Sequence, residues 1–183
     1  MSAAPARFHV DNVSDVVCPW CFIGKHRLEA AIAEWRRGDL QASFVVDWHP
    51  FQLNPDLPPE GVDRRAYLEA KFGGPERAAT IYERVRAAGR TAGIEFEFDR
   101  IARQPNTLDA HRLVSWAQAR RDAGDLVEAL FRAYFLEGRY VGDRAVLAKI
   151  TEFIADLKPD DVDLLKGLHR IQHHYRYIPP DAI

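Results

Sequence analysis

The sequence predicts an α/β fold in which a βαβ unit is followed by a large block of helices. Phe8–Val13 is predicted to form a short strand. In the stretch 42–48, Phe44, Val46 and Trp48 alternate with less apolar neighbours, which is typical of a second strand. From about residue 60 onward, apolar residues recur at helical spacing instead.

The segment between the two strands predicts a helix over 19–37. Pro19 suits the first helical turn, where its missing N–H group costs nothing. Leu28, Ile32 and Trp35 recur at helical spacing, and Gly38 suits the end of a helix. A strand, helix and strand in this order form a right-handed crossover with parallel strands.

The middle of the chain predicts an inserted helical subdomain over 60–155. Its helices are expected at 63–72, 75–92, 107–121, 125–136 and 143–154, and one more at 160–175. We therefore expect a single domain over 1–183, with the βαβ unit at 7–55 and a divergent tail at 156–183.

Charge and hydropathy exclude several classes of protein. The 183 residues carry a formal net charge of -2, which gives no attraction to nucleic acid or to anionic membranes. No apolar run is long enough to cross a bilayer, and residues 1–7 lack the apolar core of a signal peptide. We therefore expect a cytoplasmic protein.

The only two cysteines, Cys18 and Cys21, are the main candidates for catalysis. A C-x-x-C pair that follows a strand and opens a helix is typical of thiol–disulfide exchange. The helix N-terminus favours a Cys18 thiolate, and Cys21 lies one turn further on, where its sulfur can resolve a mixed disulfide. Pro19 and Trp20 lie between the cysteines, and Phe22 follows them. Pro19 completes the motif, whereas Trp20 and Phe22 are expected to offer apolar surface to substrate.

A zinc site is the main metal alternative. His169 and His173 have the H-x3-H spacing of zinc ligands, and with Cys18 and Cys21 they would make four. The two pairs are much further apart in sequence than the usual ~12–15 residues. We therefore expect no metal.

Four segments resemble the DsbA family, and in particular its cytoplasmic FrnE-like branch. They are Ser14–Lys25, Pro50–Pro55, Asn106–Arg112 and Gly138–Asp143. The resemblance covers about residues 8–150. It implies a thioredoxin fold with a helical insertion after the second strand. It also implies thiol–disulfide exchange on protein thiols and disulfides or on a small molecule, without a cofactor beyond the Cys18–Cys21 pair, and with glutathione as a candidate co-substrate.

Two other functions remain open. The same superfamily contains the 2-hydroxychromene-2-carboxylate isomerases and the kappa-class glutathione transferases, which typically carry serine in place of Cys18. A glutathione-dependent isomerase or transferase is therefore one alternative. The other is a binding protein whose cysteines are vestigial.

Asn106 and His111 are further candidates for the site. In the family, the segment that contains them begins a helix near the active-site cleft. Asn106 is a good helix N-cap. His111 lies one turn inside that helix and is expected to pack against the βαβ unit, so either residue is a candidate for substrate contact.

The resemblance ends after Ile150. The family continues to a Gly-Val-Pro-like segment, two strands and a helix, whereas here the only candidate for that proline is in Tyr177–Pro180, and almost no chain follows it. We therefore expect the C-terminal part of the thioredoxin sheet to be missing or divergent. An unpaired strand edge invites pairing with another chain, so a homo-oligomer is expected.

Overall fold

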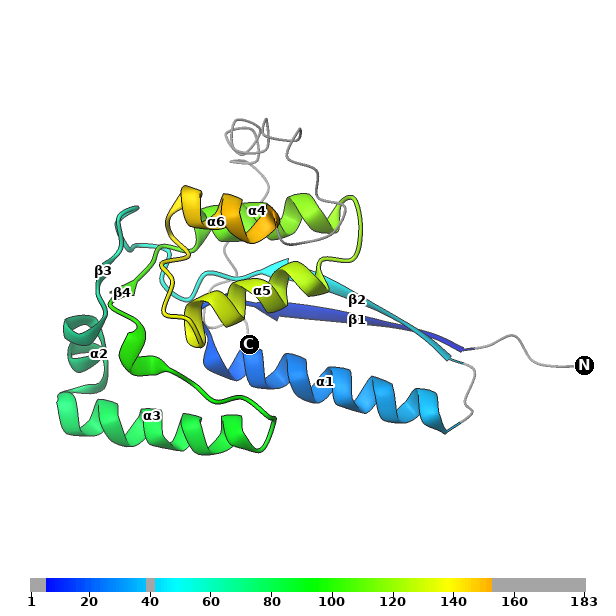
Figure 1. Ribbon diagram of the computed structural model, residues 1–183, viewed down its shortest axis with the longest axis horizontal. Coiled ribbons are helices and arrows are strands. Elements are labelled where there is room, and N and C mark those ends of the chain that lie inside the picture. The colour runs from blue at the N-terminus through cyan, green and yellow to red at the C-terminus, as the bar shows by residue number, and fades with distance from the viewer. Residues whose placement is uncertain (1–5, 39–41, 153–183) are drawn as a thin grey trace, which may run out of the picture.

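The computed structural model describes residues 6–38 and 42–152. The chain opens with a βαβ unit, as predicted, with strands longer than expected (Figure 1). The unit consists of β1 (Ala6–Ser14), α1 (Pro19–Arg37) and β2 (Ala42–Pro50). β1 and β2 are parallel, and their register runs from Ala6 opposite Ala42 to Ser14 opposite Pro50.

The ends of α1 follow from its sequence. Cys18 is the N-cap residue with extended backbone angles, and Pro19 takes the first helical position. At the other end, the Gly38 N–H group donates to the Trp35 carbonyl at 3.1 Å. The cysteine motif is therefore fixed at the junction of strand and helix.

The predicted helical block is present, and each helix lies within a few residues of its expected range. The helices are α2 (Arg64–Phe72), α3 (Pro75–Arg90), α4 (Leu108–Gln118), α5 (Gly124–Phe135) and α6 (Arg144–Glu152). The sequence did not predict the antiparallel pair of β3 (Val62–Asp63) with β4 (Arg103–Gln104), or the 3-10 helix η1 (Phe98–Arg100). Strands of two residues are too short to show an alternating pattern.

The centre of the core is α5, which contacts α1, α4 and α6 (Figure 1). Phe131 and Phe135 of α5 are fully buried. Phe22 of α1 stacks on Phe131 with ring centroids 5.0 Å apart, and Phe96 lies edge-on to Phe135 at 5.3 Å. The first turns of α1 are thus anchored in the helical subdomain.

The sheet is packed less well than the helices. β1 is exposed over most of its length, and the side chains of Phe8 and Val13 are 41% and 52% exposed. β2 is held better, because the Gln118 amide of α4 donates to Asp47 at 2.7 Å and accepts from the Trp48 N–H group at 3.3 Å. The sheet is therefore fixed mainly at the end that carries the cysteine motif.

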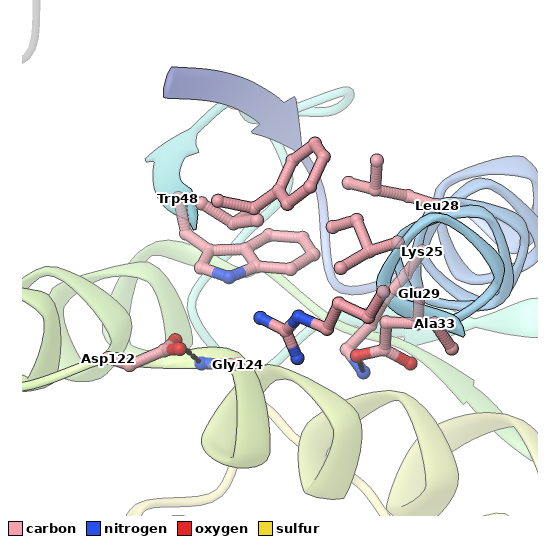
Figure 2. Close-up of a pocket in the computed structure, with 11 residues that line it drawn as sticks. Lys25, Leu28, Glu29, Ala33, Trp48, Asp122 and Gly124 are labelled. Carbon is pink, nitrogen blue, oxygen red and sulfur yellow. Dashed lines mark hydrogen bonds and ion pairs between the residues drawn. The ribbon is translucent and has the colours of Figure 1, made fainter. Parts of the chain in front are cut away.

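A buried ion pair joins the βαβ unit to α5. Lys25 of α1 is 2% exposed, and its ammonium group donates to Glu29 at 2.5 Å and to Glu128 of α5 at 2.8 Å. Figure 2 shows Lys25 and Glu29 on α1 across a pocket of about 220 Å³ from Trp48 of β2. This pocket lies between one face of α1 and β2, and beyond it Trp35 of α1 contacts Phe8 and Phe44 of the sheet.

Several predictions fall on residues 153–183, outside the residues described. These are the helix at 160–175, the segment 177–180 and the divergent end of the sheet. The expected pairing between chains also remains a prediction. Within 6–38 and 42–152, no helix has the length and apolar character that crossing a membrane requires.

Candidate active site

Cys18 and Cys21 lie on the first turn of α1, at the carboxyl end of β1. The Cys18 N–H group donates to the Asp15 carbonyl at 2.9 Å, and the Cys18 carbonyl accepts from the Cys21 N–H group at 3.1 Å. Both cysteines are free thiols and both are half-buried. The loop and the helix start thus bring the two sulfurs together, as the motif predicts.

The two thiols share a hydrogen bond that separates their acidities. This bond lowers the pKa of Cys21 to about 6, against the effect of burial and with help from the Ser14 hydroxyl and the Asp15 N–H group. The same bond, followed by burial, raises the pKa of Cys18. This order is the reverse of the one predicted from the helix terminus. Thiols this close titrate as a pair, so the site holds one shared thiolate near neutral pH.

Asp15 is the residue of this site that the sequence reasoning missed. It is 1% exposed, directly precedes Val16-Val17-Cys18, and uses both carboxylate oxygens. Oδ2 accepts from the Leu53 N–H group at 2.7 Å, and Oδ1 accepts from the Val17 N–H group at 3.3 Å. A buried carboxylate with backbone donors fixes the loop that carries the cysteines.

His111 joins this network, as its expected packing against the βαβ unit requires. It lies in α4, is 3% exposed, and its Nε2 is 3.2 Å from Asp15 Oδ1. The imidazole holds the carboxylate and does not line the surface beside the sulfurs. The structure therefore gives His111 a positioning role, through Asp15.

Asn106 lies at the start of α4 but is not the N-cap residue predicted, because the helix begins one residue later than expected. Thr107 is the N-cap residue, whereas Asn106 Oδ1 accepts from the Leu108 N–H group at 3.0 Å. The same oxygen accepts from the Gln52 amide at 3.1 Å. Asn106 thus holds the helix start and also ties it to the loop after β2.

Trp20 and Phe22 have different environments, and only one matches the expectation of apolar surface for substrate. The Trp20 side chain is 54% exposed beside the cysteines. Phe22 is fully buried and stacked on Phe131, so its predicted contact with substrate is wrong. The residue after Cys21 points into the core because it lies on the face of α1 that packs on α5.

Three of the four segments that carry the family resemblance meet at Asp15, and the fourth lies beside the third. Asp15 of the first segment binds Leu53 of the second and His111 of the third. Gly142 of the fourth segment lines the same pocket as Asn106 and Asp109 of the third. In the parts of the chain that are described, no three His, Cys, Asp or Glu side chains group as metal ligands, and His169 and His173 lie outside those parts.

A comparison with protein families decides which family this architecture represents. The model of the DSBA-like thioredoxin domain matches residues 9–156. The chain belongs to this family. The predicted resemblance to DsbA proteins and the predicted thioredoxin-like fold with a helical insertion are therefore confirmed.

Individual relatives of this DSBA-like chain agree with the family. The Bacillus subtilis protein YwbO, itself uncharacterized, is 27% identical over 144 residues, which are 79% of this chain and 64% of YwbO. The chain thus spans less than two thirds of that relative. A crystal structure of a probable DsbA oxidoreductase from Streptomyces coelicolor is 28% identical, with a TM-score of 0.72 over 87% of this chain and 68% of that one.

A structure from Nitrosomonas europaea, 17% identical, superimposes with a TM-score of 0.53 over 89% of this chain and 77% of that one. At that identity it shows the shared fold alone. Membership of the DSBA-like family supports thiol–disulfide oxidoreductase or related isomerase chemistry.

Proposed function

We propose that this protein is a thiol–disulfide oxidoreductase, a disulfide oxidase or isomerase, that works through Cys18-Pro19-Trp20-Cys21. The observation that carries the proposal is the pair of free thiols sharing a thiolate at the start of α1. A thiolate is the attacking species in disulfide exchange. The proposed substrates are protein thiols and disulfides or a small molecule, with glutathione as a candidate co-substrate, in the cytoplasm.

In the reducing direction, the Cys18 thiolate attacks one sulfur of a substrate disulfide. A Cys18–substrate disulfide forms and the other substrate sulfur leaves as a thiolate. Cys21, as thiolate, then attacks Cys18, which closes the Cys18–Cys21 disulfide and releases the second substrate sulfur. Two electrons pass from the protein to the substrate, and the reverse sequence oxidises a dithiol.

We assign the attack to Cys18 because it is the N-cap residue at the N-terminal end of α1, whereas Cys21 lies one turn inside the helix. Within the shared hydrogen bond, the proton passes from Cys18 to Cys21 as Cys18 reacts. The lowered pKa of Cys21 also suits its second role, since a resolving cysteine must ionise before it attacks.

The presence of Cys18 where the related isomerases typically carry serine favours redox chemistry over glutathione-dependent isomerisation. A binding protein with vestigial cysteines would not need a thiol with a lowered pKa. No feature of the described site favours either alternative.

The test is reduction of insulin disulfides by the reduced protein, compared with Cys18→Ser, Cys21→Ser and the double variant. We expect activity in the wild type alone. Cys21→Ser should accumulate a mixed disulfide with substrate, because the second attack is lost, whereas Cys18→Ser should not. A wild type no more active than the double variant would contradict the proposal.

Two measurements on the reduced protein test how the cysteine pair ionises and which of the two cysteines attacks. Thiolate absorbance at 240 nm should rise as the pH passes through about 6, since ionisation follows the lowered pKa. Limiting alkylation near neutral pH, read by peptide mass spectrometry, should label Cys18 first. Preferential labelling of Cys21 would assign the attack to Cys21 instead.

A further inference from the structure

Arg64 is a buried cation for which the described residues provide no acidic partner. It is 4% exposed, and no carboxylate lies within ion-pair distance of it in the described part of the chain. Buried charges in proteins are normally paired, because an unpaired ion in a low dielectric is costly. Arg64 is also the first residue of α2, where the helix dipole disfavours a positive charge.

The hydrogen bonds of Arg64 are incomplete and go to neutral groups. Nη1 donates to the Gln104 side-chain oxygen and to the Tyr134 hydroxyl, both at 3.0 Å. Nη2 is buried and has no hydrogen-bond partner among the residues described. Its two N–H groups therefore lack an acceptor among the described residues.

Aromatic rings surround the guanidinium group. Its carbon lies 5.1 Å from the centroid of Tyr82, 5.7 Å from that of Tyr134 and 5.8 Å from that of Phe98. Rings stabilise a cation in part through their quadrupoles, but they accept no conventional hydrogen bond from Nη2. The rings also make the surroundings apolar.

Arg64 lines a cavity of about 490 Å³ between α2, α3 and the segment that contains η1. Tyr82, Phe98 and Leu68 supply apolar walls, and neither cysteine contributes to it. This volume is in the range of small-molecule sites, which combine apolar walls with a few polar groups.

The other charges of the cavity, two arginines and three carboxylates, are held in ion pairs with one another. Arg65 pairs with Glu69 at 2.9 Å. Arg86 pairs with Asp99 at 2.7 Å and with Glu83 at 3.1 Å. Arg64 is thus the arginine of the cavity that is left for a ligand. Three carboxylates close to the same cavity disfavour a dianion and favour a ligand with a single negative charge.

We propose that this cavity binds a small carboxylic acid with an apolar body, whose carboxylate accepts hydrogen bonds from Arg64. The apolar body packs against Tyr82 and Phe98. The ligand supplies the negative charge and the hydrogen-bond acceptors that the described residues do not offer to Arg64. The site is separate from the cysteine pair and is independent of the proposed redox function.

The experiment uses benzoate as the probe and ligand-observed saturation-transfer NMR with the full chain to measure its affinity. Benzamide, a neutral molecule of nearly the same shape, is the matched ligand. We expect saturable binding of benzoate, and binding of benzamide at least tenfold weaker, because hydrogen bonds to an ion are stronger than neutral ones. Equal binding of the two, or no saturable binding of benzoate, would overturn the proposal.

Arg64→Met should weaken benzoate binding about ten- to hundredfold, the loss of a hydrogen-bonded charge contact. Arg77→Met is the matched control, because Arg77 is exposed on α3 and does not line this cavity. Should Arg64→Met fail to fold, Ala79→Leu adds a larger side chain to the cavity lining from an exposed position and should also abolish binding. Benzoate affinity that either variant retains in full would overturn the proposal.

Discussion

The two-stranded sheet and the helical subdomain differ in how they are stabilised, although both belong to one fold. β1 leaves Phe8 and Val13 substantially exposed, whereas Phe131 and Phe135 of α5 are fully buried. The cysteine pair lies between the two regions, on a helix whose first turns pack on α5. The helical insertion, and not the sheet, is therefore the main support of the candidate active site.

The largest loss of stability is expected when a ring is removed from the helical core. Phe131→Ala should lower the free energy of unfolding by about 3–5 kcal/mol, because it deletes a fully buried side chain and leaves a cavity beneath Phe22. Urea denaturation of the reduced protein measures this. A loss below about 1 kcal/mol would show that the core is not centred on α5.

The next largest effect is expected at the boundary between the regions. Asp15→Ala leaves the N–H groups of Val17 and Leu53 without their acceptor, which should lower stability by about 2–4 kcal/mol. Asp15→Asn is the conservative variant that tests how the Asp15 charge affects the two thiols. Beyond the larger effects of their shared hydrogen bond and burial, the Asp15 charge raises the pKa of both cysteines.

Removing that charge should therefore shift the thiolate titration to lower pH in Asp15→Asn. Absorbance at 240 nm measures the shift in the same samples as the denaturation. A purely structural role of Asp15 would lower stability and leave the titration midpoint where it is.

Cys18, Cys21 and Asp15 lie in one short segment of the chain, but only the cysteines could be predicted from the sequence. The position of Cys18 and Cys21 at a helix start follows from local spacing, and so do the helices, because their apolar periodicity is long. The order of acidity of the two thiols does not follow from it. Asp15 was not singled out, because its partners Leu53 and His111 are 38 and 96 residues away. Phe22 was misassigned for a related reason: which face of α1 is buried depends on where α5 packs.

Arg64 was unpredictable for the same physical reason. A sequence shows an arginine at a helix start but not which rings close around it. The two-residue strands β3 and β4 were missed because they carry no periodic signal. Local pattern therefore predicts elements, whereas burial and pairing of single polar groups depend on contacts between distant segments.

A smaller effect is expected at the ion pair that joins the two regions. Glu128→Gln should lower stability at neutral pH by about 1–2 kcal/mol, since Lys25 keeps only Glu29 as a charged partner. Burial opposes ionisation of Glu128, but hydrogen bonds and charge from Lys25 and His26 hold its pKa below the ordinary value.

A carboxyl group with a lowered pKa stabilises the fold above its unfolded pKa, near 4.5, and loses this contribution as the pH falls through the folded value. The stability difference between wild type and Glu128→Gln should therefore be full at pH 7 and shrink under acid conditions. Denaturation at a series of pH values checks this, with Glu34→Gln, an exposed glutamate of α1, as the control. A difference independent of pH would assign the loss to packing.

The smallest effect is expected in the sheet itself. Phe8 of β1 stacks on Phe44 at 5.2 Å and meets Trp35 edge-on at 5.9 Å, but it remains 41% exposed. Phe8→Ala should therefore lower stability by no more than about 1 kcal/mol, the value of aromatic pairing near the surface. The same urea denaturation measures it, and insulin reduction should stay unchanged, because the cysteines are anchored through α1 to α5. A loss as large as that of Phe131→Ala would show that the sheet carries as much of the stability as the helical core, and would remove the distinction between the two regions.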